Sequence, residues 1–388
     1  MTARQFYIML FIIVVSLKVQ KLPSLIAESL EKDTYLLIIL YLIINLLLIC
    51  LAFFILKNTK QSSLKNNSKS VVLNLLKKLL LIGISAYFIF QSLLFYESIQ
   101  NLFAHVLFYE LPWTLFSLML TVCVFYLAYT GIKNIALNFE LYAFMVLASY
   151  VIISIFGGTK ADFKSILPFE SVNIKQIGEI FLDFNMWFGD FFLVLFMGKH
   201  AKHIKLKWTA LVYSVSMLFV ALLYIEFFGI YQDYTPMKPS LISVLSEQSM
   251  LGVNIGRIDW FFILFTEIGT ILSAGVCLYF ANKSLSFAFP KIKKTYLLIV
   301  LTAAIYFIDI FYLVDIHTQK ELFIDILSNV ALIIKLLSFL CLLIYAISKQ
   351  KHNKKQQNTL QKQMKLKPAK NNILFDNAKN LGGEKWER

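Results

Sequence analysis

The sequence has little charge and few residues of the kinds that carry catalysis. Charged residues make up 15% of its 388 positions. The five histidines are scattered, none stands in an H-E-x-x-H arrangement, and neither a P-loop nor a dinucleotide-binding fingerprint occurs. The four cysteines lie inside apolar segments and form no C-x-x-C pair, which argues against a zinc site or a redox disulfide. We therefore expect no enzyme active site, no metal and no cofactor.

Apolar residues, in contrast, are abundant. They make up 59% of the chain, which includes 36 phenylalanines, whereas soluble domains contain roughly 45–50%. A helix needs about 20 mostly apolar residues to cross the hydrocarbon core of a membrane. Ten segments meet this demand, and we predict an all-α integral membrane protein with helices at 6–27, 35–56, 79–99, 113–130, 139–156, 184–197, 208–230, 258–281, 296–314 and 324–347.

The basic residues predict the orientation of the chain. The net charge is +14, and lysines gather in every second loop, with acids in the loops between them. By the positive-inside rule this places both termini on the cytoplasmic side, and it argues against nucleic acid as the partner. Residues 348–388 form a basic tail that is too poor in apolar residues to fold by itself, and we expect it to be disordered.

Two of the predicted spans are irregular, and each opens one half of the chain. The first has polar residues where a membrane helix should be apolar, which predicts a break near Ser16 to Gln20 with Pro23 early in a second half-helix. The sixth is too short unless 174–182 completes it, with a break around 185–190. Broken helices at matching places favour a five-plus-five inverted repeat, over about 6–156 and 174–347, with a ligand site at the midplane. A simple kink in each helix is the alternative.

Unpaired backbone groups at such breaks could bind both charged groups of an amino-acid ligand. Half-helix N-termini attract a carboxylate, and freed carbonyls attract an ammonium group. Ionisable residues deep in the spans should face the bundle interior. Two candidate pairs are Glu267 with Lys335 and Lys18 with Asp190, either functional or merely structural. Four other acids lie nearer span ends, and we expect them to be mostly wetted: Glu97, Glu226, Asp259 and Asp309.

Polar residues also follow single helical faces. In the last span Asp325, Ser328, Asn329, Lys335 and Ser338 approximate one face, and in the third Tyr87 and Gln91 are one turn apart. We expect both faces to look inward. Either a permeation path or hydrogen bonding between helices would explain such a stripe.

Three segments carry a resemblance to a known family. The opening TARQF with the later LKVQKLPSLIAES, the stretch LPFESVNIKQIGEIFLDFNMWFGDFFLVLF and the stretch GRIDWFFILF resemble the B-subunit family of spore germination proteins, a branch of the amino acid/polyamine/organocation permeases. The resemblance implies ten helices in two repeats, the spore inner membrane, and a germinant receptor shared with an A-type and a lipid-anchored C-type subunit. It places the ligand pocket at Ser16, Tyr87, Gln91, Asn185, Trp187, Gly189, Thr266, Glu267 and Thr270. Relatives more often carry a small pair of residues in the first break, and Lys18 argues here against ion coupling because its ammonium could replace a cation.

Three functions fit these observations. The leading one is a nutrient receptor subunit, in which an amino acid binds between the broken helices and biases their conformation. The alternative is a gradient-coupled amino-acid permease, with Glu267 or Asp190 as the coupling group. A membrane scaffold with no ligand of its own is the third.

Overall fold

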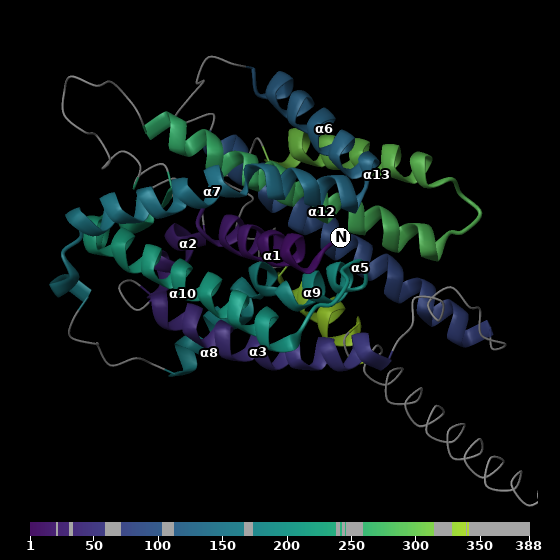
Figure 1. Ribbon diagram of the computed structural model, residues 1–388, viewed down its shortest axis with the longest axis horizontal. Helices are drawn as coiled ribbons and strands as arrows, with labels where there is room; N and C mark the ends of the chain where they lie inside the picture. The colour runs from purple at the N-terminus through teal and green to yellow at the C-terminus, as the bar shows by residue number, and fades with distance from the viewer. Residues whose placement is uncertain are drawn as a thin grey trace, which may run out of the picture.

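A computed structural model describes most of the chain. The described residues are 1–20, 22–30, 34–58, 71–102, 112–166, 174–237, 259–313 and 328–338, together with 241, 242, 245 and 340. Within these ranges the secondary structure is entirely helical, without strands (Figure 1). The predicted helical class is therefore confirmed. The basic tail at 348–388 lies outside the described residues.

The first half of the chain contains the long helices α3 (Thr34–Asn58), α5 (Val71–Leu102), α6 (Trp113–Thr130) and α7 (Ile132–Lys160), preceded by α1 (Ala3–Lys18) and α2 (Leu22–Leu30). The second half contains α8 (Ile174–Asp183), η4 (Phe184–Phe188), α9 (Asp190–Gly198), α10 (Leu206–Tyr231), η5 (Gln232–Met237), α12 (Asp259–Ala288), α13 (Lys294–Ile308) and η6 (Asp309–Leu313). A further apolar helix covers Ser328–Ser338. Each predicted span thus coincides with helix over at least part of its length.

Length and composition mark the chain as a multi-pass membrane protein. Among the described residues six helices are long and apolar enough to cross a bilayer, and a seventh span is obtained if α1 and α2, bent by 44°, are taken together. Large apolar side chains stand on the outer surface, such as Phe144 at 81% and Leu141 at 70% exposed. Only lipid makes such a surface favourable. The count of ten spans and the inverted repeat stay predictions.

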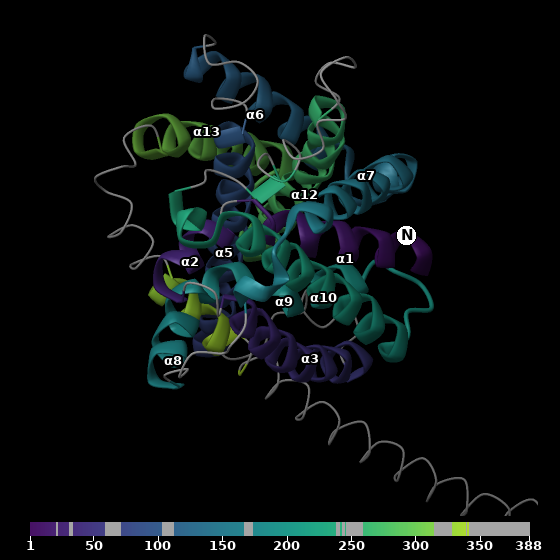
Figure 2. The same cartoon turned by 90° about the vertical axis from the view of Figure 1, so that its left-hand side faces the viewer.

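Helix α1 lies at the centre of the bundle, in contact with α7, α9, α10 and α12 (Figure 1, Figure 2). Its start is fixed by a capping box, in which the Thr2 hydroxyl accepts the Gln5 N–H and the Gln5 side chain accepts the Thr2 N–H. Apolar residues cover most of its circumference, as expected for a helix buried on all sides. The central position brings its C-terminal break into the middle of the protein.

Helix α12 packs closely against α1, α5, α6 and α7, because it presents small residues to its neighbours. A Cβ added at Gly275 would lie 2.9 Å from the Leu127 Cβ of α6, and one added at Gly269 would lie 3.0 Å from Ile12 of α1. The Ser85 hydroxyl of α5 donates to the Ala281 carbonyl at 2.9 Å. These contacts join α12 to α1, α5 and α6.

Candidate functional site

Both predicted breaks are present. Helix α1 ends at Lys18, and α2 begins at Leu22 with Pro23 in its first turn, where the missing N–H of proline costs nothing. Two backbone carbonyls at the break are bonded by groups from other segments. The Lys18 carbonyl accepts from the Tyr224 hydroxyl at 2.6 Å, and the Gln20 carbonyl accepts from the Leu241 N–H at 3.0 Å. The break is a built structure and not a simple kink.

The second break separates α8 from α9. The 3-10 turn η4 and Gly189 interrupt the helix, so Ile174–Asp183 supplies the length that the sixth span lacks. The aromatic ring of Phe188 stacks on Tyr41 of α3, with centroids 3.5 Å apart and planes at 5°. This stacking fixes the turn against α3 and brings Asp190, the first residue of α9, into the interior.

An ion pair joins the two breaks. The Lys18 Nζ lies 2.9 Å from the Asp190 Oδ1, and both side chains are buried, at 0% and 1% exposed. The other carboxylate oxygen of Asp190 accepts from the Tyr213 hydroxyl of α10 at 2.9 Å. The predicted Lys18–Asp190 pair is thus formed. It ties the end of one half-helix to the start of another across 172 residues of sequence.

Lys335 makes a second contact with the η4 turn. Its Nζ donates to the backbone carbonyl of Asn185 and, at 3.1 Å, to the Asn185 side-chain oxygen, while it lies 5.2 Å from the centroid of the Tyr87 ring. The amide nitrogen of Asn185 is buried and makes no hydrogen bond. Lys18 and Asp190 are close enough for their charges to act on Lys335. This cluster therefore holds two ammonium groups and one carboxylate.

Two further polar pairs lie beside the first break. The Gln20 Nε2 donates to the Glu267 Oε1 at 2.6 Å, and the hydroxyls of Ser16 and Tyr150 are 2.8 Å apart. The predicted Glu267–Lys335 pair is wrong, because the two residues bond to Gln20 and Asn185 instead. The second carboxylate oxygen of Glu267 is buried without a partner.

The other residues of the predicted pocket are buried but differ in their contacts. Thr266 and Thr270 donate to carbonyls of their own helix, Ile263 at 2.8 Å and Thr266 at 3.2 Å, so their hydroxyls are used locally. Gln91 and Trp187 are 4% and 5% exposed. The structure brings the predicted residues of α1, η4, α9 and the Ser328–Ser338 helix together, and a ligand-binding role for them stays a prediction.

Sequence reasoning missed the tyrosines that complete the site. Tyr150, Tyr213 and Tyr224 are fully or almost fully buried, and each hydroxyl bonds to a residue of the first or second break. A tyrosine in the middle of a span indicates a hydrogen bond inside the bundle, since its hydroxyl needs a partner away from lipid. Without the fold, nothing in the sequence says which partner it takes.

Two acids that were expected to be wetted are buried. Glu226 is 3% exposed and accepts from the Ser154 hydroxyl at 2.8 Å, and Asp309 is 0% exposed. On the polar face of the last helix Ser328, Lys335 and Ser338 are buried but Asn329 is exposed. Position along a span therefore predicted burial poorly, because neighbouring helices extend past the span ends and cover them.

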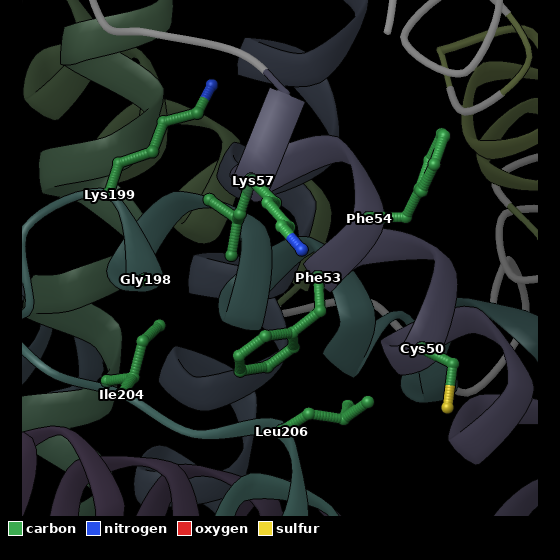
Figure 3. Close-up of a pocket in the computed structure, with 9 residues that line it drawn as sticks. Cys50, Phe53, Phe54, Lys57, Gly198, Lys199, Ile204 and Leu206 are labelled. Carbon is green, nitrogen blue, oxygen red and sulfur yellow. The ribbon is translucent and has the colours of Figure 1, made fainter. Parts of the chain in front are cut away.

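A groove of about 690 Å³ lies elsewhere, where α3 and α9 end and α10 begins (Figure 3). Its lining is mostly apolar, with Phe53 in its centre and Lys57 and Lys199 above it. None of the predicted pocket residues lines it. Lys199 has no described acidic partner, and burial together with the charge of Lys283 lowers the pKa of Lys199 to about 8.

His200 completes the basic surface beside this groove. Burial and the charge of Lys283 lower the pKa of His200 to about 4, so the ring is neutral at pH 7. The ring Nδ1–H then donates to the Phe196 carbonyl at 3.0 Å, which leaves Nε2 to accept from the Lys283 ammonium. The histidine thus acts as a structural hydrogen-bonding group at this end of the bundle.

Comparison with known families shows to which family the chain belongs. The profile of the spore permease family, described as spore germination protein, matches residues 1–318. The chain belongs to this family. The match covers the breaks of both halves and everything up to the end of α13, and the resemblance noted from sequence is confirmed. No individual curated protein gives a significant match.

Membership agrees with the helical membrane fold of the chain and with the absence of catalytic motifs in its sequence. The family is permease-like, and the described residues form a helical fold of the integral-membrane type. Among the described residues no group of three or more His, Cys, Asp or Glu residues is arranged to hold a metal ion. The buried cluster between the breaks is the feature to which a function can be assigned.

Proposed function

We propose that this spore germination protein is the transmembrane subunit of a nutrient germinant receptor, and that it binds an amino acid between its two broken helices. The observation that carries the proposal is the cluster at the breaks. In their ordinary ionised forms, Lys18, Lys335 and Asp190 together carry one net positive charge, and all three side chains are buried. A ligand carboxylate would neutralise it, using the Lys335 ammonium and the unpaired amide nitrogen of Asn185.

The amino group of the same ligand has a partner on α12. Glu267 keeps one carboxylate oxygen without a hydrogen bond, and its neighbours Ser16 and Tyr150 lie at the first break. An ammonium group there would satisfy that oxygen. Because Lys18, Gln20 and Asn185 belong to the breaks themselves, a ligand bound to this cluster would favour one arrangement of the half-helices over another.

The wider assembly belongs to the same proposal. The ten-helix inverted repeat supplies the midplane site, the spore inner membrane is the location, and both termini lie on the cytoplasmic side. A-type and C-type subunits of the receptor read the conformational change. The basic ends of α3 and α9, near Lys57 and Lys199, support this orientation by the positive-inside rule.

The experiment uses spores in which the natural copy is replaced by Asn185→Leu or Lys335→Met. Germination is scored by loss of optical density against a panel of amino acids, and protein level is measured by immunoblot. Loss of one charged hydrogen bond should raise the half-saturating nutrient concentration about tenfold or more. The control is Asn329→Ala, an exposed residue on the helix of Lys335, and should leave the response unchanged. Unchanged germination in both site variants, with protein present, would show that this pocket is wrong.

A gradient-coupled permease is the second candidate, and the unpaired carboxylate oxygen of Glu267 favours it as a proton site. Uptake of a radiolabelled amino acid into proteoliposomes decides between the two. Transport that an ionophore abolishes and that Glu267→Gln removes would establish a permease. No uptake under a proton or sodium gradient, together with a germination defect in spores, would establish a receptor. No binding of any amino acid to purified protein would leave the scaffold reading.

A further inference from the structure

A second buried polar cluster lies well away from the breaks, where three helices meet. Asp309 opens the π-helical turn η6 at the end of α13, Gln100 belongs to α5 and Ser117 to α6. All three side chains are 0% exposed. A π turn adjoining an α-helix is rare and is often found at functional sites.

The hydrogen bonds of this cluster are unevenly distributed. Asp309 Oδ2 accepts twice, from Gln100 Nε2 at 2.5 Å and from the Ser117 hydroxyl. Asp309 Oδ1 and Gln100 Oε1 accept nothing, although both are buried. Turning the Gln100 amide over would not help, since its oxygen would then face the carboxylate. The two unpaired atoms are both acceptors, so they require a positively charged or hydrogen-donating group.

Negative charge gathers at the same place. Glu97, one turn before Gln100 on α5, is near enough for its charge to act on Asp309. The ion pairs among the described residues are Arg4–Glu140 and Lys18–Asp190, and neither involves Asp309. A carboxylate inside a membrane bundle is costly unless a counter-charge is present. Here the described part of the chain supplies none to Asp309.

Tyr96, which lies near Asp309, and its neighbour Thr121 offer further oxygen ligands. The Tyr96 hydroxyl, on the α5 face of Gln100, lies near Asp309 and beside the Thr121 hydroxyl of α6, without a well-formed hydrogen bond between the two. Oxygen ligands suit hard cations, and the unpaired atoms of Asp309 and Gln100 are both oxygens. One buried carboxylate surrounded by neutral oxygens matches a single positive charge better than two.

From this geometry we propose that Asp309, Gln100, Ser117 and Tyr96 form a binding site for one alkali metal cation, between α5, α6 and the π turn of α13. The cation would contact the free oxygens of Asp309 and Gln100 and hold the three helices together. The site is separate from the amino-acid site and does not depend on it. Its occupant would stabilise the packing of α5 and α6 against η6.

Purified full-length protein in nanodiscs provides the test. Thermal unfolding, followed by tryptophan fluorescence, is measured in sodium, potassium or N-methylglucamine chloride at constant ionic strength. We expect a saturable rise of Tm by about 2–4 °C in sodium or potassium at ten times the dissociation constant. The bulky organic cation should have no such effect. Binding of ²²Na⁺ in a scintillation assay gives a second readout that needs no unfolding.

Variants then assign the effect to this cluster. Asp309→Asn should abolish the cation response, while Gln100→Leu should weaken cation affinity about tenfold. The control is Thr302→Val on the same helix, whose hydroxyl bonds its own Leu298 carbonyl at 2.7 Å, and it should keep the full response. If Asp309→Asn does not fold, the cation response is measured in Ser117→Ala instead. Equal Tm of the natural protein in sodium, potassium and the organic cation would overturn the proposal. So would stability that changes with pH alone, which would identify a protonated carboxyl group.

Discussion

The hydroxyl of Tyr87 occupies the place where a side chain of Gly189 would stand. A Cβ at position 189 would collide with the Tyr87 hydroxyl, would lie 2.5 Å from the ring carbon that bears it, and would lie 3.0 Å from Lys335 Cε. Position 189 therefore requires glycine because a Cβ there would clash with Tyr87, and not because of its backbone conformation. The side chain that excludes any other residue comes from α5, which links the break to the third predicted span.

This contact makes the first prediction. Gly189→Ala should lower the stability of the protein by about 1–3 kcal/mol, since a buried aromatic ring must move. Tyr87→Leu should restore much of the loss in the double variant, which a double-mutant cycle of Tm values measures. The control is Gly178→Ala on α8, where nothing lies within 4 Å of the added carbon and helix propensity favours alanine. Equal effects of the two alanine variants would contradict the contact.

The buried ion pair makes the second prediction. Lys18→Met alone or Asp190→Leu alone should each cost about 3–5 kcal/mol, because each leaves an unpaired charge in the interior, whereas the double variant should recover most of this loss. The exposed Arg4–Glu140 pair is the control, at 3.4 Å and with the arginine 77% exposed. Its double alanine variant should change stability by at most about 1 kcal/mol. Thermal unfolding in detergent gives all values, and additive single costs would argue against the pair.

Glu226 makes the third prediction. Ser154→Ala should cost about 1–3 kcal/mol, since it removes the hydrogen bond to a buried carboxylate. Glu226→Gln should be neutral or stabilising, because it keeps the shape of the side chain and removes the charge. Ser149→Ala, five residues earlier on α7, is the control: its hydroxyl bonds the Met145 carbonyl of its own helix at 2.8 Å. A stability loss in Glu226→Gln larger than in Ser154→Ala would show that the charge itself is needed.

Lys199 makes a prediction about pH. Its pKa is lowered to about 8 in the folded protein, from 10.5 for a free side chain. Between these two values the unfolded chain holds more protons than the folded one, so stability should rise as the pH rises from 8 to 10.5. Lys199→Met should remove this rise and stabilise the protein by about 1–2 kcal/mol at pH 7, allowing for the partial exposure of the lysine. Lys202 is an exposed lysine three residues further on, and Lys202→Met should neither remove the rise nor stabilise the protein. The measurement is Tm as a function of pH for the natural protein and the two variants.

The sequence predicted the parts of the fold that depend on local composition. Apolar length identified the spans, and polar residues inside an apolar run located the break at Ser16 to Gln20, since lysine and glutamine in a membrane helix need a special environment. The same reasoning found Lys18 and Asp190 as partners. It paired Glu267 with Lys335 wrongly, because depth in the bilayer says nothing about which faces of two helices meet.

Burial of the acids at span ends was harder to foresee. Glu226 and Asp309 lie near helix ends in sequence, yet neighbouring helices cover them in the structure. The hydroxyl partners that make this possible, Ser154 and Ser117, are ordinary residues in their own spans. Only the packing of α5, α6, α7 and α10 brings them into contact with the acids. The cluster around Asp309 therefore emerges from tertiary structure alone.

Lys18 supplies Asp190 with a counter-charge that is part of the chain, so the central site needs no free cation. A free cation at Asp190 would come and go with its concentration in the medium, whereas an ammonium attached to the chain stays at a constant, high effective concentration. The junction between α1 and α9 consequently keeps its charge balance in a membrane that carries no ion gradient at all.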